Sequence, residues 1–384
     1  MAFRIVGWIF VCVLASSGAG LAAGISKRDA QILDKQVFDL SGPIESGDLE
    51  RLRALAPSDG QSIISFDSNG GDFQAGLALA RYLHEKSIGT IVEDGRKCLS
   101  ACAIAFLGGT ALGEESSLLP ARSIAPTARL GFHAPFLNVG QGQYGEEQIE
   151  GSYDKAVRTI VDVVQTAEVF QVDASDAAEL MRPQRQEMTY LDSADELGTY
   201  FVVPQGLEMP EHLTPTMVAA MCANGWLWAH NDRMTDVTAF ENPDVFANSL
   251  KLIAKTGWNG KHATVKMDDG SLRTAVPLTQ AREGATMYCA VSQVATEFGK
   301  ATFCDGFFDA DSLKEAVEFV KNGWEMRYPC GVSMVVDPLK GGDDAYFNVS
   351  RALVPPSTPL DGMQDRLTEL AATEEPLPAP ELAK

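Results

Sequence analysis

The chain has 384 residues, and its 52 acidic side chains outnumber the 31 lysines and arginines, which gives a formal net charge of −21. Nucleic acid and anionic membrane surfaces would repel so acidic a protein, so neither is an expected partner. After the N-terminal segment the sequence contains no basic run, no heptad series and no second apolar stretch of spanning length. We therefore expect no membrane association once that segment has been removed.

Residues 1–23 are typical of a secretory signal peptide. Arg4 is followed by an apolar run from Ile5 to Leu14 and then by small residues up to Ala23. The apolar run is short for a membrane span, and a retained N-terminal anchor is the alternative. We expect an exported protein, with the periplasm as its compartment.

Six cysteines follow this segment: Cys98, Cys102, Cys222, Cys289, Cys304 and Cys330. An even number in an exported chain favours disulfides over free thiols or structural zinc. The first two are far from the others in sequence, so we expect Cys98 to pair with Cys102 and the remaining four to pair among themselves, in an order that the sequence does not define. No metal and no cofactor is expected.

After a polar lead-in over residues 24–35, the pattern alternates between strands and helices. Strands are expected at 37–40, 62–66 and 89–92, and helices at 47–55 and 73–84. The run from Ala101 to Leu107 is apolar on every side, which predicts a buried helix with Ser100 at its mouth. Leu130 and Phe132 then alternate with Gly131 and His133, and this strand pattern places His133 on the face opposite the two apolar side chains.

Helices are expected at about 149–170 and 174–181, and a strand at 199–203 closes this α/β domain, which covers residues 36–205. A second unit over 212–350 has the pattern of an α+β domain with disulfides. Strands are expected there at 226–228, 262–267 and 272–276, with the turn 268–270 between the last two. Ser312 and Glu315 form a capping-box pattern that opens a helix ending at Gly323. The stretch 352–384 is rich in proline and acid, and we expect a disordered tail.

Three motifs in the first domain together supply the parts of a serine hydrolase. They are a glycine turn at Asp67-Ser68-Asn69-Gly70-Gly71-Asp72, a serine between cysteines at Cys98-Leu99-Ser100-Ala101-Cys102, and the segment Gly131-Phe132-His133-Ala134-Pro135. Such parts would provide backbone amides for an oxyanion, a nucleophile and a base. Each has a plainer interpretation when taken alone: a turn, a helix N-cap and a half-buried histidine.

In this order the motifs resemble those of the Clp protease proteolytic subunit, and more closely those of exported Clp-like proteins of bacteria, which carry the two cysteines around the serine. The resemblance covers about residues 36–205 and does not extend to the C-terminal unit. It implies a ClpP/crotonase-like superhelix of repeated ββα units, followed here by a smaller α+β domain.

The resemblance also implies roles for individual residues. Ser100 matches the nucleophile, His133 the general base, and the amides of Gly71 and Ala101 the oxyanion hole. A disulfide between Cys98 and Cys102 would clamp the turn that presents the serine.

The third member of the triad is where the sequence departs from the family pattern. In the family an aspartate precedes an aromatic-leucine pair, which corresponds to Tyr190-Leu191, and this alignment places Met188 where the acid should be. Glu187, one residue earlier, is the predicted orienting group, and Asp192 is the reserve. A triad without its acid loses roughly 10⁴-fold in rate in the serine-protease case.

The expected function is an ATP-independent exported serine peptidase that forms an acyl-enzyme on Ser100 and acts on peptides or unfolded polypeptides. The missing aspartate favours an alternative, a catalytically weak or inactive fold that serves as a binding or assembly module. An acyl-CoA enzyme of the crotonase kind is a third interpretation, but acyl-CoA is not expected outside the cytoplasm. The family builds rings or trimers, so a homo-oligomer stays open.

Overall fold

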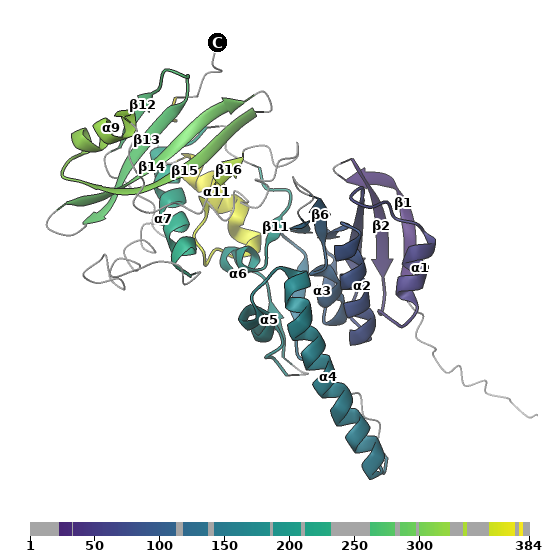
Figure 1. Cartoon of the computed structure of the whole chain (residues 1–384). Coiled ribbons are helices and arrows are strands. Elements are labelled where there is room, and N and C mark those ends of the chain that lie inside the picture. The colour runs from purple at the N-terminus through teal and green to yellow at the C-terminus, as the bar shows by residue number, and fades with distance from the viewer. Residues whose placement is uncertain are drawn as a thin grey trace, which may run out of the picture.

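The computed structural model describes residues 23–32, 34–112, 118–136, 142–184, 187–208, 212–231, 262–280, 285–296, 299–322, 333–335, 353–372 and 376–378. Nearly all of the expected signal peptide, and Cys330, lie outside these residues. The described part of the chain is a mixed α/β protein with two main sheets, and the helices α7 (Pro215–Asn231) and α11 (Met363–Ala372) lie between them (Figure 1). None of the described helices combines the length and the apolar character that a membrane span requires.

The first sheet has six strands, in the order β1 (Gly24–Ile32), β2 (Lys35–Ser41), β3 (Ser62–Asp67), β4 (Gly89–Val92), β8 (Arg122–Ile124) and β11 (Val202–Pro204). Every neighbouring pair is parallel except β1 and β2. The central strands β3 and β4 are almost wholly buried. Their continuous apolar sequences are those of parallel strands covered on both faces.

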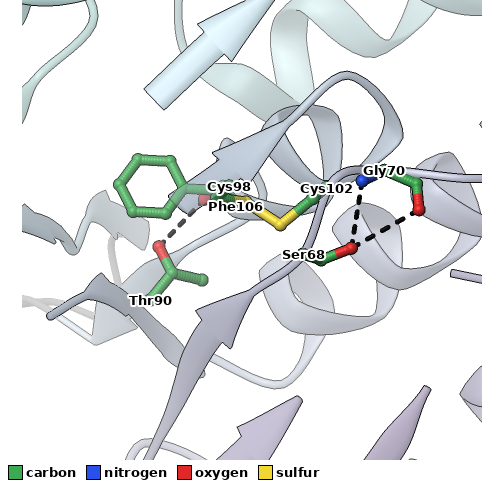
Figure 2. Close-up of a disulfide and its surroundings, with 6 residues drawn as sticks. All are labelled: Ser68, Gly70, Thr90, Cys98, Cys102 and Phe106. Carbon is green, nitrogen blue, oxygen red and sulfur yellow. Dashed lines mark hydrogen bonds between the residues drawn. A yellow bond between two sulfur atoms is a disulfide. The ribbon is translucent and has the colours of Figure 1, made fainter. Parts of the chain in front are cut away.

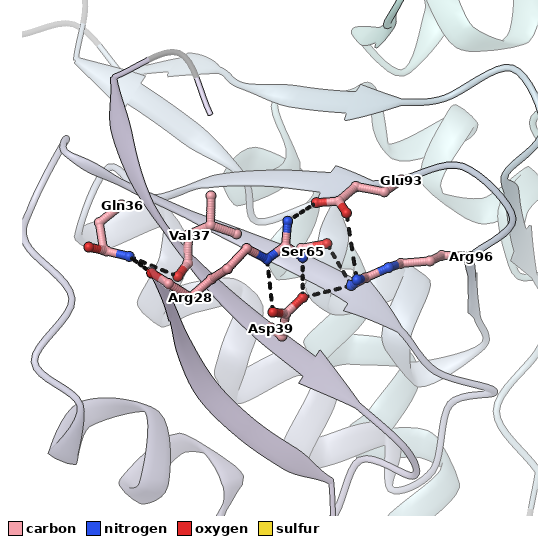
Figure 3. A network of polar contacts seen from close by, with 7 residues as sticks. All are labelled: Arg28, Gln36, Val37, Asp39, Ser65, Glu93 and Arg96. Carbon is pink, nitrogen blue, oxygen red and sulfur yellow. Dashed lines mark hydrogen bonds and ion pairs between the residues drawn. The ribbon is translucent and has the colours of Figure 1, made fainter. Parts of the chain in front are cut away.

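The lead-in expected over residues 24–35 is instead the edge strand β1, which pairs with β2. Arg28 on β1 donates hydrogen bonds to Asp39 on β2 and, at 2.7 Å, to Glu93, while Arg96 donates to Asp39, also at 2.7 Å (Figure 3). The hydrogen bonds to Asp39 and Glu93 raise the pKa of Arg28. A strand held by such polar contacts, with one face open to solvent, has few apolar residues, and this explains why its sequence resembled a loop.

A unit of a strand, a second short strand or bridge residue, and a helix occurs three times in the first domain. The successive units are β3, the bridge residue Ser68 and α2 (Phe73–Glu85); β4, β5 (Lys97–Leu99) and α3 (Ala101–Phe106); and β8, β9 (Arg129–Phe132) and α4 (Glu146–Phe170). The first strand of each unit belongs to the six-stranded sheet. The second strands lie together in a small sheet of order β10-β9-β5, where β10 is Thr189–Tyr190. All residues of α3 are buried, as its sequence predicts.

A buried arginine fastens the end of this domain. Arg122 on β8 is fully buried and donates to the carbonyl oxygens of Tyr200, at 2.9 Å, and Phe170. Phe170 ends α4 and Tyr200 is the C-cap of α6 (Ala194–Thr199), so the cation meets the negative ends of two helices. The prediction of a strand at 199–203 is wrong for its first residues. A capping box formed by Ser193 and Glu196 begins α6, which runs to Thr199, and the strand β11 begins only at Val202.

The second unit contains an antiparallel sheet of five strands, with α9 (Leu313–Asn322) in contact with it. The strands are β12 (Ala263–Lys266), β13 (Leu272–Gln280), β14 (Thr286–Thr296), β15 (Gly299–Ala310) and β16 (Ser333–Val335). The predicted hairpin at 268–270 is confirmed. The predicted strand at 226–228 is wrong, because it falls inside α7 (Pro215–Asn231), whose residues 217–223 are buried on every side.

The C-terminal stretch that we expected to be disordered is folded over residues 353–372. It contains the short helix η5 (Leu360–Gly362) and α11 (Met363–Ala372), which bury Leu360, Met363, Leu367 and Leu370 at helical spacing. The Leu360 amide donates to the carbonyl of Asp192 in the first domain at 2.7 Å. The acidic residues lie on the other side of α11, so the composition concealed an amphipathic helix.

Replacing Leu367 with alanine should lower the free energy of unfolding by about 2–5 kcal/mol, because Leu367 is fully buried and its loss leaves a cavity. Leu112, which is 58% exposed, gives the matched control, and Leu112→Ala should change the stability by less than about 0.5 kcal/mol. Denaturant titration of both variants measures the difference. Equal effects would show that α11 is not docked on the protein.

Candidate active site

The small sheet brings the three sequence motifs to one edge. Ser68 forms a parallel bridge with Cys98, and Cys98 pairs in parallel with Leu130 on β9. Each of these residues stands three positions before a predicted site residue, namely Gly71, Ala101 and His133. Because parallel strands advance together, the register leads all three site positions to the same end of the sheet.

Ser100 has an unusual backbone conformation. It lies between β5 and α3 with φ +56° and ψ −123°, a combination outside the usual regions for a residue with a side chain. Its amide donates to the carbonyl of Gly131 on β9 at 2.8 Å, which holds the turn against the neighbouring strand. Strain of this kind costs about 1–3 kcal/mol and persists only where the surroundings enforce it.

The Ser100 side chain does not act as a helix cap. Although Ser100 is the residue before α3, its hydroxyl makes no capping hydrogen bond. The residue is partly exposed, whereas every residue of the helix that follows is buried. A partly exposed serine therefore stands at the mouth of α3, and the plainer interpretation of Ser100 as a side-chain N-cap does not hold.

The glycine turn packs directly on this serine. Gly70 has φ +97°, and a Cβ at this position would lie 2.7 Å from both the Cβ of Ser100 and the carbonyl oxygen of Leu99. The amide of Gly70 donates to the hydroxyl of Ser68 at 3.0 Å, which fixes the turn (Figure 2). Only glycine permits both this backbone conformation and this approach.

Two backbone amides beside Ser100 are free to donate. The N–H groups of Gly71 and Ala101 make no hydrogen bond to any other described residue. Gly71 is exposed and has φ +153°, while Ala101 begins α3, where an amide has no partner within the helix. These are the two amides that the sequence predicted as oxyanion donors.

A disulfide spans the serine turn. Cys98 and Cys102 are bonded to each other, as predicted, and both are fully buried (Figure 2). The bond links the last part of β5 to the first turn of α3, with Ser100 between them. The turn is therefore closed covalently as well as by the hydrogen bond to Gly131.

His133 is buried and follows β9 directly. Its Nδ1 lies 2.7 Å from the carbonyl oxygen of Ala134, and Phe136 stacks on its ring with centroids 5.3 Å apart. Since a carbonyl oxygen only accepts, Nδ1 carries the proton and Nε2 of the neutral ring is the nitrogen that can take one. No hydrogen bond joins the ring to Ser100 within the described part of the chain.

Neither predicted carboxylate contacts this histidine. Glu187 is exposed, and its side chain has no hydrogen bond or ion pair to another described residue. Asp192 lies beside Glu196 and Asp361, and partial burial together with these two acids raises its pKa. In the structure neither acid is hydrogen-bonded to the Nδ1 of His133. The role of Glu187 as orienting group stays a prediction.

Met188 occupies the position next to the histidine instead. In the antiparallel pairing of β10 with β9, Thr189 faces Phe132 and Tyr190 faces Gly131, so the next pair in register is Met188 and His133. The sulfur of Met188 lies against Gly131. The alignment of the aromatic-leucine pair had pointed to the same residue.

A second group of cysteines does not form a metal site. The sulfurs of Cys222, Cys289 and Cys304 lie within 4.8 Å of one another. Cys222 and Cys289 form a disulfide between α7 and β14, in agreement with the expected pairing among the C-terminal cysteines, and Cys304 is also disulfide-bonded. Bonded sulfurs are not thiolates, so this group has no ligands to offer a metal ion.

The sequence motifs contained Ser68, Gly70 and Ala134, but three of their contacts at this site could not be predicted from them. Gly70 packs on the serine, Ser68 holds the glycine turn, and the carbonyl of Ala134 holds the histidine. Pro135 was the available signal for the last, because a proline restricts the residue before it to an extended conformation.

No protein-family model matches the chain, and no curated protein matches it in sequence.

Gly70→Ala should destabilise the protein by about 2 kcal/mol more than Gly95→Ala, because both glycines have positive φ but only Gly70 lacks room for a Cβ. A Cβ on Gly95 would have no neighbour within 4 Å. Unfolding free energies of the two variants measure the difference. Equal losses would contradict the close packing of Gly70 on Ser100.

Proposed function

We propose that the chain is an exported serine peptidase that works without ATP, with Ser100 as nucleophile and His133 as general base. The observation that carries this proposal is the strained serine turn. Ser100 stands between a strand and a helix, outside the usual backbone regions; the residue is partly exposed and its hydroxyl makes no capping hydrogen bond. A sharp strand-to-helix turn is also how α/β-hydrolases expose their catalytic serine.

The three repeated units support a ClpP/crotonase-like superhelix for the first domain. In each unit a strand of the large sheet is followed by a short strand or bridge in the small sheet and then by a helix. The glycine turn, Ser100 and His133 follow the second strand of successive units. A fold made by repetition thus supplies three equivalent positions, and each contributes one part of the proposed site.

The proposed reaction begins when the Oγ of Ser100 attacks the carbonyl carbon of a peptide bond. Its proton passes to Nε2 of His133, and the same nitrogen later gives that proton to the departing amine. Water then hydrolyses the acyl-enzyme by the reverse proton path. Catalytic hydrogen bonds are often long before the substrate binds, so we expect the contact between Ser100 and His133 to form in the complex.

The free amides of Gly71 and Ala101 would stabilise the negative oxygen of the tetrahedral intermediate. Donors of this kind are worth about 10²–10³ in kcat each when they are fixed before the reaction. The turn at Gly70 is fixed by Ser68 and by its contact with Ser100, and Ala101 is held by the adjacent disulfide. Both donors are therefore preorganised.

The proposed substrates are peptides or polypeptides that are already unfolded. In the periplasm no ATP-driven unfoldase would prepare a folded protein, so the substrate must reach Ser100 as an extended chain. The described disulfides suit an oxidising compartment of this kind.

A binding or assembly module without activity is the second candidate. The observation in its favour is that a carbonyl group, and no carboxylate, holds Nδ1 of His133 in the described part of the chain. A neutral partner stabilises the imidazolium ion less than a charged one, so the base would be weaker.

A fluorophosphonate probe should label the full-length folded protein at Ser100. Ser100→Ala should abolish the labelling, and His133→Ala should slow it by about 10²–10⁴-fold through loss of the general base. Ser26→Ala, at an exposed serine of β1, is the control and should label like the wild type. Mass spectrometry of the labelled peptide identifies the site. A folded wild-type protein that does not react would leave the binding module as the function.

A second copy of this chain is the proposed partner at α4. One side of this helix carries exposed apolar side chains: Ile149, Tyr153, Val157, Val161 and Val164. Its C-terminal half packs on α2 through Gln74 and Arg81, while the helix extends beyond the sheet (Figure 1). In an antiparallel pair of such helices, the exposed Asp154 and Arg158 at the edge of the apolar side would face each other across the interface.

Tyr153→Glu should lower the native mass from that of an oligomer to that of a monomer, because it buries a charge in the proposed interface. Glu150→Gln, an exposed change in the same helix, should leave the mass unaltered. Native mass spectrometry or light scattering reports the result. A wild type that is monomeric at every concentration would exclude the second copy.

A further inference from the structure

We propose that the main-chain carbonyl of Ala134 orients His133, in the place where a serine triad has its acid, and that Met188 occupies the position from which a carboxylate would act. This inference rests on the proposed function of Ser100 and His133. It assigns a positioning role to a backbone group and leaves the nucleophile and the base as already described.

The neutral ring of His133 carries its proton on Nδ1. Nδ1 of His133 lies 2.7 Å from the Ala134 oxygen, and this hydrogen bond requires a proton on Nδ1. Nε2 is then the basic nitrogen of the neutral ring. A triad aspartate selects this same tautomer. The Ala134 carbonyl therefore fixes the tautomer and the orientation of the ring as the aspartate would.

The carbonyl group of Ala134 is held in place from both sides. The amide of Ala134 donates to the carbonyl of Pro183 at 2.8 Å, which anchors the preceding peptide, between His133 and Ala134. Pro135 follows on the other side and limits the conformations of Ala134. An acceptor held in this way can orient a ring, whereas a mobile carbonyl could not.

The residue opposite His133 is Met188, which is not an acid. The register of β10 on β9, continued by one residue past the ends of both strands, sets Met188 opposite His133, and opposed residues of antiparallel strands share a face of the sheet. Their Cβ atoms are about 4.5–5.5 Å apart in such pairs, within reach of an aspartate at position 188. The side chain of Met188 is uncharged and cannot stabilise a positive imidazole ring.

Two consequences follow for the rate. Because the carbonyl already selects the correct tautomer, the protein avoids the large loss of about 10⁴-fold that a wrong tautomer causes. Because the carbonyl is neutral, the positive ring formed during the reaction is less stabilised than it would be beside a carboxylate. The site should therefore be slow but functional.

The first test is nuclear magnetic resonance of the full-length protein with labelled histidine nitrogens. The correlations of the His133 ring, identified by their loss in His133→Gln, should show the proton on Nδ1. A proton on Nε2 in the neutral ring would overturn the inference. This readout needs no activity, so it stands even if Ser100 proves unreactive and the proposed function fails.

The second test compares Met188→Asp with Met188→Asn, which has the same shape without the charge. Met188→Asp should raise the rate of fluorophosphonate labelling at Ser100 by about tenfold to a hundredfold, as a charge-assisted hydrogen bond replaces a neutral one. Met188→Asn should label at the wild-type rate. If the wild type reacts and the folded Met188→Asp protein reacts no faster, or if the two variants gain equally, the inference is wrong.

Discussion

The backbone of Ser100 is the constraint on which the site depends. A residue with a side chain does not adopt φ +56° and ψ −123° without support. Here the support comes from three sides: the disulfide from Cys98 to Cys102, the hydrogen bond to Gly131, and the packing of Gly70. Each of these contacts joins the serine to another repeated unit or to its own helix, so the site exists only when the small sheet has formed.

Much of the first domain could be predicted because its local patterns and its packing agree. The strands β3 and β4 are apolar and buried, α3 is apolar and buried, and the hairpin between β12 and β13 has the expected turn. The pairing of Cys98 with Cys102 also followed from short separation in an exported chain. In each case one local signal was sufficient, since no distant partner had to be known.

The errors lie where a distant partner decides the structure. The polar residues of β1 form a strand because Arg28 meets Asp39 and Glu93, and the acidic segment around α11 folds because its apolar side docks on the rest of the protein. The helix α7 continues through a stretch whose alternating aromatics resemble a strand. The hydrogen bond from His133 to Ala134 belongs to the same class, because a sequence shows side chains and conceals which backbone carbonyl meets them.

The energetic cost of the strained turn at Ser100 is similar in size to the stabilisation by the disulfide that spans it. The strain at Ser100 costs about 1–3 kcal/mol, a large share of a typical stability of 5–15 kcal/mol. A bridge between cysteines four residues apart contributes about 2 kcal/mol in the chain-entropy description, so the two terms nearly cancel. Such a bridge forms readily in an oxidising compartment and poorly in the reducing cytoplasm. The conformation of the Ser100 turn is therefore stabilised most where this chain is proposed to act.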